Sequence, residues 1–256
     1  MQEIKRKFIE LILLGVVFGG VIGGWLWISI QTYGLNAEIS KADYYVFIAD
    51  PQMFFQTVFL VPIFFISLSW RLRATGRIQV IIRERNRGRV WQRYIAKVIG
   101  LAVGLTVYSS VVIWFFSLFG RVSSFNWREK HSLYWDWCGR QVLKTEGIHL
   151  ANVVAVFVVT EIILLLVVGI LFTLIYFLTS NLWVGWLCCE GLMFYRWRTL
   201  TGGGKNGVIQ KLTMDWTMWE DIPRWKDGII TGIVVILIIC GVGYVCAKKK
   251  GFLNEK

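Results

Sequence analysis

Two acidic residues, Glu161 and Glu190, interrupt runs of apolar residues that are otherwise long enough to cross a lipid bilayer. An ionised carboxylate that faces hydrocarbon is costly, so each side chain is expected to face protein or water, or to be protonated. Two interpretations follow. Either the acids line a translocation path or hold a proton, or they are hydrogen-bonded acids with a structural role only.

The basic segment 71–97 is the second group of residues that suggests a function, and it holds nine Lys and Arg residues. Apolar residues recur at helical spacing near its end, which predicts an amphipathic helix on the inner leaflet that continues into the next apolar run. The segment is interpreted either as a basic topology anchor or as a docking element for a cytoplasmic partner. In the second interpretation the docking residues are Ile78, Ile81, Ile82, Arg83, Arg85, Arg87, Arg89 and Trp91.

Patterns typical of catalytic, metal or nucleotide sites are weak in this sequence. The tract Gly202-Gly203-Gly204-Lys205-Asn206 lacks the Ser or Thr and the upstream Gly of a nucleotide-binding loop. His131 and His149 do not have the spacing of zinc ligands, and neither do the five Cys residues. We therefore predict no catalytic residue, metal site or cofactor in the chain itself.

The composition indicates an all-α, polytopic membrane protein. Of the 256 residues, 56% are hydrophobic and 14 are Trp, a residue that prefers the bilayer interface. The formal net charge is +12, but much of the positive charge flanks apolar runs. Contact with anionic lipid head groups explains that placement better than a nucleic-acid partner does.

Six membrane spans are predicted, because a spanning helix needs about 20 mainly apolar residues. The apolar stretch 150–195 is long enough for two spans, and its polar break at 179–181 predicts a tight turn. Pro62 should kink the second span. The predicted spans of this single transmembrane domain are 8–30, 52–70, 98–119, 150–178, 182–195 and 228–247.

The charges of the connecting segments predict that both termini are cytoplasmic. With six spans, the N-terminus, 71–97, the 179–181 turn and the tail share one side, which carries 16 Lys and Arg residues against 12 on the other. Cytoplasmic segments carry the excess of Lys and Arg. The expected location is therefore a cell membrane, with the basic segment 71–97 inside the cell.

Two further patterns concern packing. Gly15, Gly19 and Gly23 line one face of the first span, which favours close approach of another helix within the chain or, less simply, of a second copy. The outer segments are rich in Trp, which is typical of an interfacial belt or of short re-entrant helices, although they could instead bind an amphipathic peptide. These residues are Trp127, Trp135, Trp137, Trp197, Trp216, Trp219 and Trp225.

The order of spans, the basic segment before the third span and the tract IIRERNRGRVWQRY resemble the permease subunits of type-2 ABC exporters. The likeness is greatest to small Gram-positive permeases linked to peptide export or bacteriocin immunity, and it covers the whole chain in layout. It implies a coupling helix within segment 71–97 and a dimer with a second permease copy or paralogue. It also implies a cytoplasmic ABC ATPase dimer that carries the ATP and magnesium.

Three functions from different classes are compatible with these observations. The first is a transport subunit whose energy comes from a separate ATPase. The second is a stand-alone membrane protein for immunity or scaffolding, which binds a partner without transport. The third is an intramembrane enzyme, which the missing catalytic pattern disfavours. The basic amphipathic segment favours the first function over the second.

Overall fold

The computed structural model describes residues 2–33, 37–75, 87–119, 123–201, 214, 216–220 and 222–249. These residues are mainly helical, and across the described ranges the only β pairing is two isolated bridges, Glu38–Ser132 and Ser40–Ser123. The α-helices are α1 (Gln2–Tyr33), α2 (Lys41–Ala49), α3 (Val61–Thr75), α5 (Arg87–Ser117), α6 (Leu133–Trp137), α7 (Leu150–Thr179), α8 (Leu182–Thr201) and α10 (Ile222–Lys249). Shorter turns are the 3-10 helices η1 (Pro51–Met53) and η3 (Trp216–Glu220) and the π-helix η2 (Gln56–Leu60).

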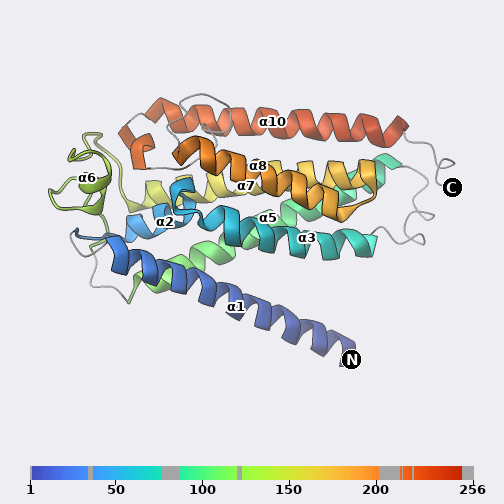
Figure 1. Cartoon of the computed structure of the whole chain (residues 1–256), viewed down its shortest axis with the longest axis horizontal. Helices are drawn as coiled ribbons and strands as arrows, with labels where there is room; N and C mark the ends of the chain where they lie inside the picture. The colour runs from blue at the N-terminus through green and yellow to red at the C-terminus, as the bar shows by residue number, and fades with distance from the viewer. Residues whose placement is uncertain are drawn as a thin grey trace.

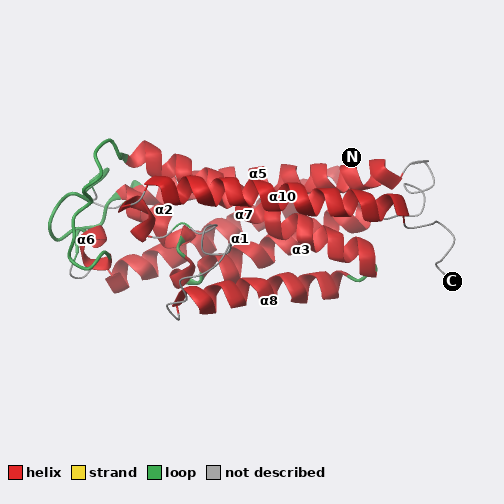
Figure 2. Ribbon diagram, turned by 90° about the horizontal axis from the view of Figure 1, so that it is seen from above, coloured by secondary structure: helices red, strands yellow, loops and turns green. Residues whose placement is uncertain are grey.

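The long helices run side by side along the long axis of the molecule (Figures 1 and 2). Helix α7 is the central one, because it packs against α2, α3, α5, α8 and α10. The first residues of α1, the end of α3, the start of α5, the turn between α7 and α8 and the end of α10 all lie at one end of the bundle (Figure 1). Helices α2 and α6 lie toward the other end.

Four of the described helices are long and apolar enough to cross a membrane, which supports a membrane-embedded protein. The qualifying stretches are Gly15–Thr32, Gly88–Ser117, Leu150–Thr179 and Lys226–Lys248. Helix α3 has only 15 residues, and α8 carries Glu190, Arg196 and Arg198 within its 20 residues. Both nevertheless run alongside the four (Figure 1).

The predicted turn at 179–181 is present between α7 and α8. Ser180 adopts a left-handed conformation with φ of 56°, and the Asn181 side chain accepts a hydrogen bond from the Trp183 backbone N–H at 2.9 Å. The helix that contains the fifth predicted span, 182–195, begins at Leu182 and continues past that span to Thr201. The third predicted span, 98–119, lies in a helix that already begins at Arg87, so the helix of the basic segment continues into this span as predicted.

The second predicted span has an irregular start. Asp50 caps η1 by accepting a hydrogen bond from the Gln52 N–H at 2.8 Å, and Phe54 then turns the chain with φ of 64°. The π-helical turn η2 follows and leads into α3, in which Pro62 is the second residue. A π-turn widens the helix locally, and such turns are frequent at functional sites.

The glycine stripe of α1 is occupied from within the chain. The Tyr108 hydroxyl of α5 donates a hydrogen bond to the Gly15 carbonyl, and its ring stacks on Phe18. A Cβ added at Gly23 would lie 2.1 Å from the Phe116 ring. Internal packing of α1 on α5 therefore explains why this face lacks side chains, as the first of the two interpretations predicted.

An aromatic cap closes the end of the bundle that holds α2 and α6. Trp127 is fully buried, stacks on Tyr134 and meets Trp219 edge-on at 5.5 Å. Trp216 is also buried in this cluster, between Trp127 and Phe47. The prediction that the outer Trp residues form an interfacial belt is therefore wrong for Trp127, Trp216 and Trp219, which join separate chain segments into one core.

Candidate functional site

A chain of buried polar side chains links three parts of the bundle. Glu161 on α7, Gln56 on η2 and Arg196 on α8 are 1%, 4% and 4% exposed. The Gln56 amide N–H donates to a Glu161 carboxylate oxygen at 2.5 Å, and the Gln56 amide oxygen accepts from the Arg196 guanidinium at 3.0 Å. An acid and a base are thus held close together in an apolar interior through a single amide.

A second acid contributes to the same site. Asp50, the residue that caps η1, is 1% exposed and interacts electrostatically with Arg196, as Glu161 does. A buried guanidinium is tolerated when opposite charges and hydrogen bonds compensate for the water that it loses. The two carboxyls, one from the connection between α2 and η1 and one from α7, supply that compensation.

The register of the α7–α8 hairpin brings Arg196 to Glu161. Along the two antiparallel helices, Gly185 lies against Phe172, and the Cys189 thiol donates to the Val168 carbonyl at 3.8 Å. Continuing this pairing away from the turn places Arg196 level with Glu161. Arg196, Gln56 and Asp50 were not among the residues selected from the sequence, because Arg196 and Asp50 look like the polar flanks of spans. The register around the predicted turn could have identified Arg196.

Two polar atoms of this cluster make no hydrogen bond within the described part of the chain. The second carboxylate oxygen of Glu161 and the Nε of Arg196 are buried, and neither has a hydrogen-bond partner among the described residues. Buried polar atoms without partners are rare in folded proteins and often mark functional positions. The cluster can therefore accept and donate further hydrogen bonds without breaking the bonds that join its three helical segments.

Glu190, the other acid selected from the sequence, lies outside this cluster. Its side chain is half-buried on α8, and one carboxylate oxygen is shielded without a hydrogen-bond partner in the described part of the chain. Glu161 faces protein, as expected of an acid within a span, whereas Glu190 is only partly covered. The structure therefore does not bring these two residues into one site.

A third buried acid, Asp43, lies in the aromatic cap and outside the long apolar helices. Its carboxylate accepts hydrogen bonds from the Ser40 backbone N–H at 2.6 Å and from the Trp127 indole N–H at 2.5 Å. Burial raises the pKa of Asp43 to about 7, although these hydrogen bonds act in the opposite direction. The protonation of the cap is thus sensitive to pH near neutrality.

The proposed docking residues are only partly described. Ile78, Ile81, Ile82, Arg83 and Arg85 lie outside the described residues, as does the glycine-rich tract at 202–206. Arg87 begins α5 and Arg89 is exposed. Trp91 is 2% exposed, so its side chain belongs to the interior of the bundle and not to a surface that a partner could contact.

Trp91 fills the space between α7 and α10. Its ring meets Phe177 of α7 edge-on at 6.0 Å, and a Cβ added at Gly243 of α10 would lie 2.0 Å from it. Val90, Tyr94 and Val98 are buried as well. The apolar face of residues 87–98 therefore packs on protein, which corrects the expectation that it lies on the inner leaflet.

No group of three or more His, Cys, Asp and Glu residues in the described part of the chain is arranged to hold a metal ion. Comparisons with protein-family models, curated proteins and solved structures found no match.

Proposed function

We propose that this chain is the membrane-spanning permease subunit of an ABC transporter that exports a peptide or another amphipathic molecule. In this proposal the protein crosses the membrane six times, with η2 and α3 as the second span and α8 as the fifth. A separate cytoplasmic ATPase dimer binds ATP and magnesium. The permease works as a dimer with a second copy or a paralogue, in the cell membrane of a Gram-positive bacterium. Its transport activity is linked to bacteriocin immunity.

The observation that carries the proposal is the continuity of α5. This single helix begins at Arg87, within the basic segment 71–97, and runs to Ser117. Near its start, Trp91 is packed against both α7 and α10. A displacement of the basic segment would therefore be passed directly to three long helices, which is what a permease without a nucleotide site requires from its coupling element.

The distribution of charge supports the proposed orientation. The start of α1, the end of α3, the start of α5 and the end of α10 lie at one end of the bundle, together with the α7–α8 turn (Figure 1). The segments at this end carry the excess of Lys and Arg. Under the positive-inside rule this end is cytoplasmic, which puts both termini inside the cell.

The buried cluster supplies a candidate element of the translocation path. Glu161, Gln56 and Arg196 belong to three different proposed spans, and their hydrogen bonds fix the relative positions of these spans. In our proposal, movement of α5 against α7 opens the cluster and exposes Glu161 and Arg196 to substrate. Glu190, on the same helix as Arg196, is placed along the same path.

The proposal is tested by co-purification with a candidate ABC ATPase from the same cell. The double variant Ile81→Ala/Ile82→Ala should lose ATPase binding while remaining in the membrane, because a hydrophobic anchor contributes strongly to docking. The matched control is Ile233→Ala/Ile238→Ala, which removes the same atoms from exposed positions on α10.

The outcomes separate the two leading functions. Loss of ATPase binding in the first double variant but not in the control supports a permease with a coupling segment. Normal binding and normal stimulation of the ATPase in both would leave segment 71–97 as a topology anchor. An ATPase that never co-purifies with the wild-type chain would favour the stand-alone immunity or scaffold protein.

A further inference from the structure

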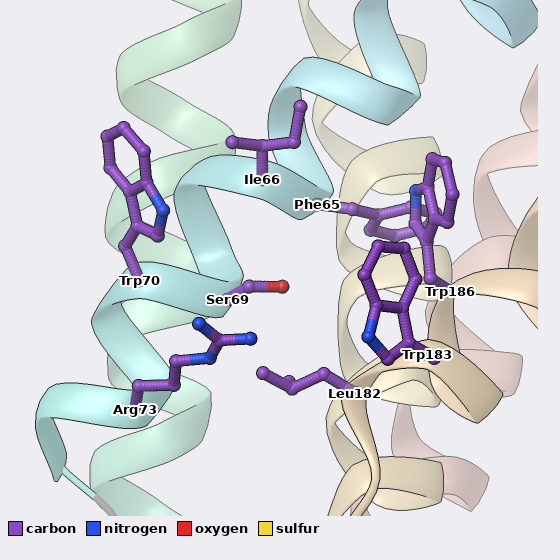
Figure 3. A pocket seen from close by; sticks show the side chains of 8 residues that line it. All are labelled: Phe65, Ile66, Ser69, Trp70, Arg73, Leu182, Trp183 and Trp186. Atoms are coloured by element: carbon purple, nitrogen blue, oxygen red, sulfur yellow. The ribbon is translucent and has the colours of Figure 1, made fainter.

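A groove of about 270 Å³ separates α3 from α8 near the end of the bundle that holds the α7–α8 turn. Figure 3 shows that Ile66, Trp70 and Arg73 line it from α3, while Trp183 and Trp186 line it from α8. Phe65 lies deeper, between the two helices. The surface of the groove is almost entirely hydrocarbon and indole.

Among the described residues that line the groove, Arg73 is the one cation, and it lies at the end nearest the α7–α8 turn. The Arg73 guanidinium points from α3 toward α8, and the Ser69 hydroxyl points the same way (Figure 3). Arg73 is exposed, and the lining residues within the described ranges include no Asp or Glu. A guanidinium presents a fork of donors that matches the oxygens of a phosphate, so Arg73 is suited to hold an anionic head group.

The rest of the groove is suited to a hydrocarbon chain. Trp70 and Trp183 are 62% and 65% exposed and flank its opening, so the groove is open from the side of the bundle. From Arg73 to Phe65 the helix rises about 12 Å, at about 1.5 Å per residue. An occupant with an anion at Arg73 and an apolar chain directed toward Phe65 would satisfy both parts of the site.

We propose that the groove binds an anionic phospholipid of the leaflet at this end of the bundle, with its phosphate on Arg73 and an acyl chain between Trp70 and Trp183. A peptide fits less well, because the side-chain hydrogen-bonding groups of the described lining residues are limited to Arg73, Ser69 and the indoles. The inference does not depend on transport. A bound lipid bridges α3 and α8. Helix α3 directly follows the π-turn that contains Gln56, and α8 carries Arg196, so the lipid stabilises the buried cluster.

The test uses the purified full chain, stripped of lipid in a neutral detergent. Phosphatidylglycerol, phosphatidylcholine and glycerol 3-phosphate are added separately, and bound lipid is measured by native mass spectrometry together with the thermal midpoint. We expect phosphatidylglycerol to bind and to raise the midpoint. Arg73→Gln should weaken its binding about tenfold, the loss expected for one charged contact, and Arg73→Lys should retain most of it.

Two controls make the test specific. Arg89→Gln removes an exposed cation near the same end without touching the groove and should leave lipid binding unchanged. Trp183→Ala should reduce binding, whereas Trp27→Ala should not, although both indoles are 65% exposed. Equal binding in wild type and Arg73→Gln would overturn the proposal. An equal loss of phosphatidylglycerol binding in Arg89→Gln would also overturn it. So would a rise of the thermal midpoint with glycerol 3-phosphate equal to that with phosphatidylglycerol, because this would indicate a site for free phosphate.

Discussion

Glu161 and Arg196 are connected through the Gln56 amide, which donates to the carboxylate at 2.5 Å and accepts from the guanidinium at 3.0 Å. The three residues are far apart in sequence and come from α7, the π-turn before α3, and α8. Because all three are buried, their interactions depend on how these helices are placed. The cluster should therefore report both on stability and on any motion between the helices.

Arg196→Gln should destabilise the protein strongly. Removing one member of a buried charged pair costs about 3–5 kcal/mol, because the other charge stays buried without compensation. Arg198→Gln is the matched control, since Arg198 lies on the same helix but is exposed. Its cost should stay below about 1 kcal/mol. Thermal unfolding of the purified proteins in one detergent measures both.

Glu161→Gln combined with Arg196→Gln should cost less than the sum of the two single changes. Each single variant leaves the other residue's charge buried without this opposite charge, whereas the double variant removes both charges. The effects of the two changes on the free energy of unfolding should therefore be coupled. The measurement is a double-mutant cycle on the free energy of unfolding. Strictly additive costs would show that Glu161 and Arg196 do not stabilise each other.

Stability should fall as the pH rises from about 4 to about 7, because the pKa of Asp43 is raised by burial from 3.8 to about 7. The unfolded chain releases this proton at lower pH than the folded chain, so folding is favoured most below pH 4 and least above pH 7. By linkage the contribution changes by about 3 kcal/mol between pH 5 and pH 8.

Asp43→Asn should remove most of this pH dependence, since an amide stays neutral throughout. Asp136→Asn, at an exposed position in α6, should leave it unchanged. Unfolding midpoints of the three proteins at pH 5 and pH 8, followed by Trp fluorescence, provide the comparison. An unchanged pH slope in Asp43→Asn would show that Asp43 is ionised in the folded cap.

Gly243→Ala should be destabilising and Gly241→Ala should not. A Cβ at Gly243 would lie 2.0 Å from the Trp91 ring, whereas nothing lies within 4 Å of a Cβ at Gly241. Overpacking typically costs about 1–3 kcal/mol. Trp91→Leu should restore part of the loss in Gly243→Ala. Equal midpoints for the two alanine variants would contradict the packing of α10 on Trp91.

The orientation can be tested with single cysteines in a background that lacks the five native ones. Glu129→Cys lies in the exposed connection at the α6 end, and Asn181→Cys lies in the exposed turn between α7 and α8. An impermeant maleimide should label position 129 in intact cells and position 181 only after permeabilisation. The reverse pattern would invert the proposed topology.

The positions of the long helices were predictable because length and hydropathy determine where a chain can cross a bilayer. The role of Arg196 was not, since a basic residue at the end of an apolar run has the composition of a flank, and its interactions with Glu161 and Asp50 appear only in the folded structure. The environments of Trp91 and Trp127 were also not predictable. An indole suits a lipid interface and a protein interior equally well, and only the contacts with Phe177 or Tyr134 distinguish the two.

The central position of α7 constrains how the protein is assembled during synthesis. Helices α1, α3 and α5 are made first, yet α3 and α5 both pack on α7, as does α2 in the cap. Until α7 leaves the ribosome, Gln56 lacks its carboxylate partner and the Trp91 ring lacks Phe177. The first half of the chain can therefore form only part of its native contacts, among them those of α1 and α3 with α5, until α7 has been synthesised.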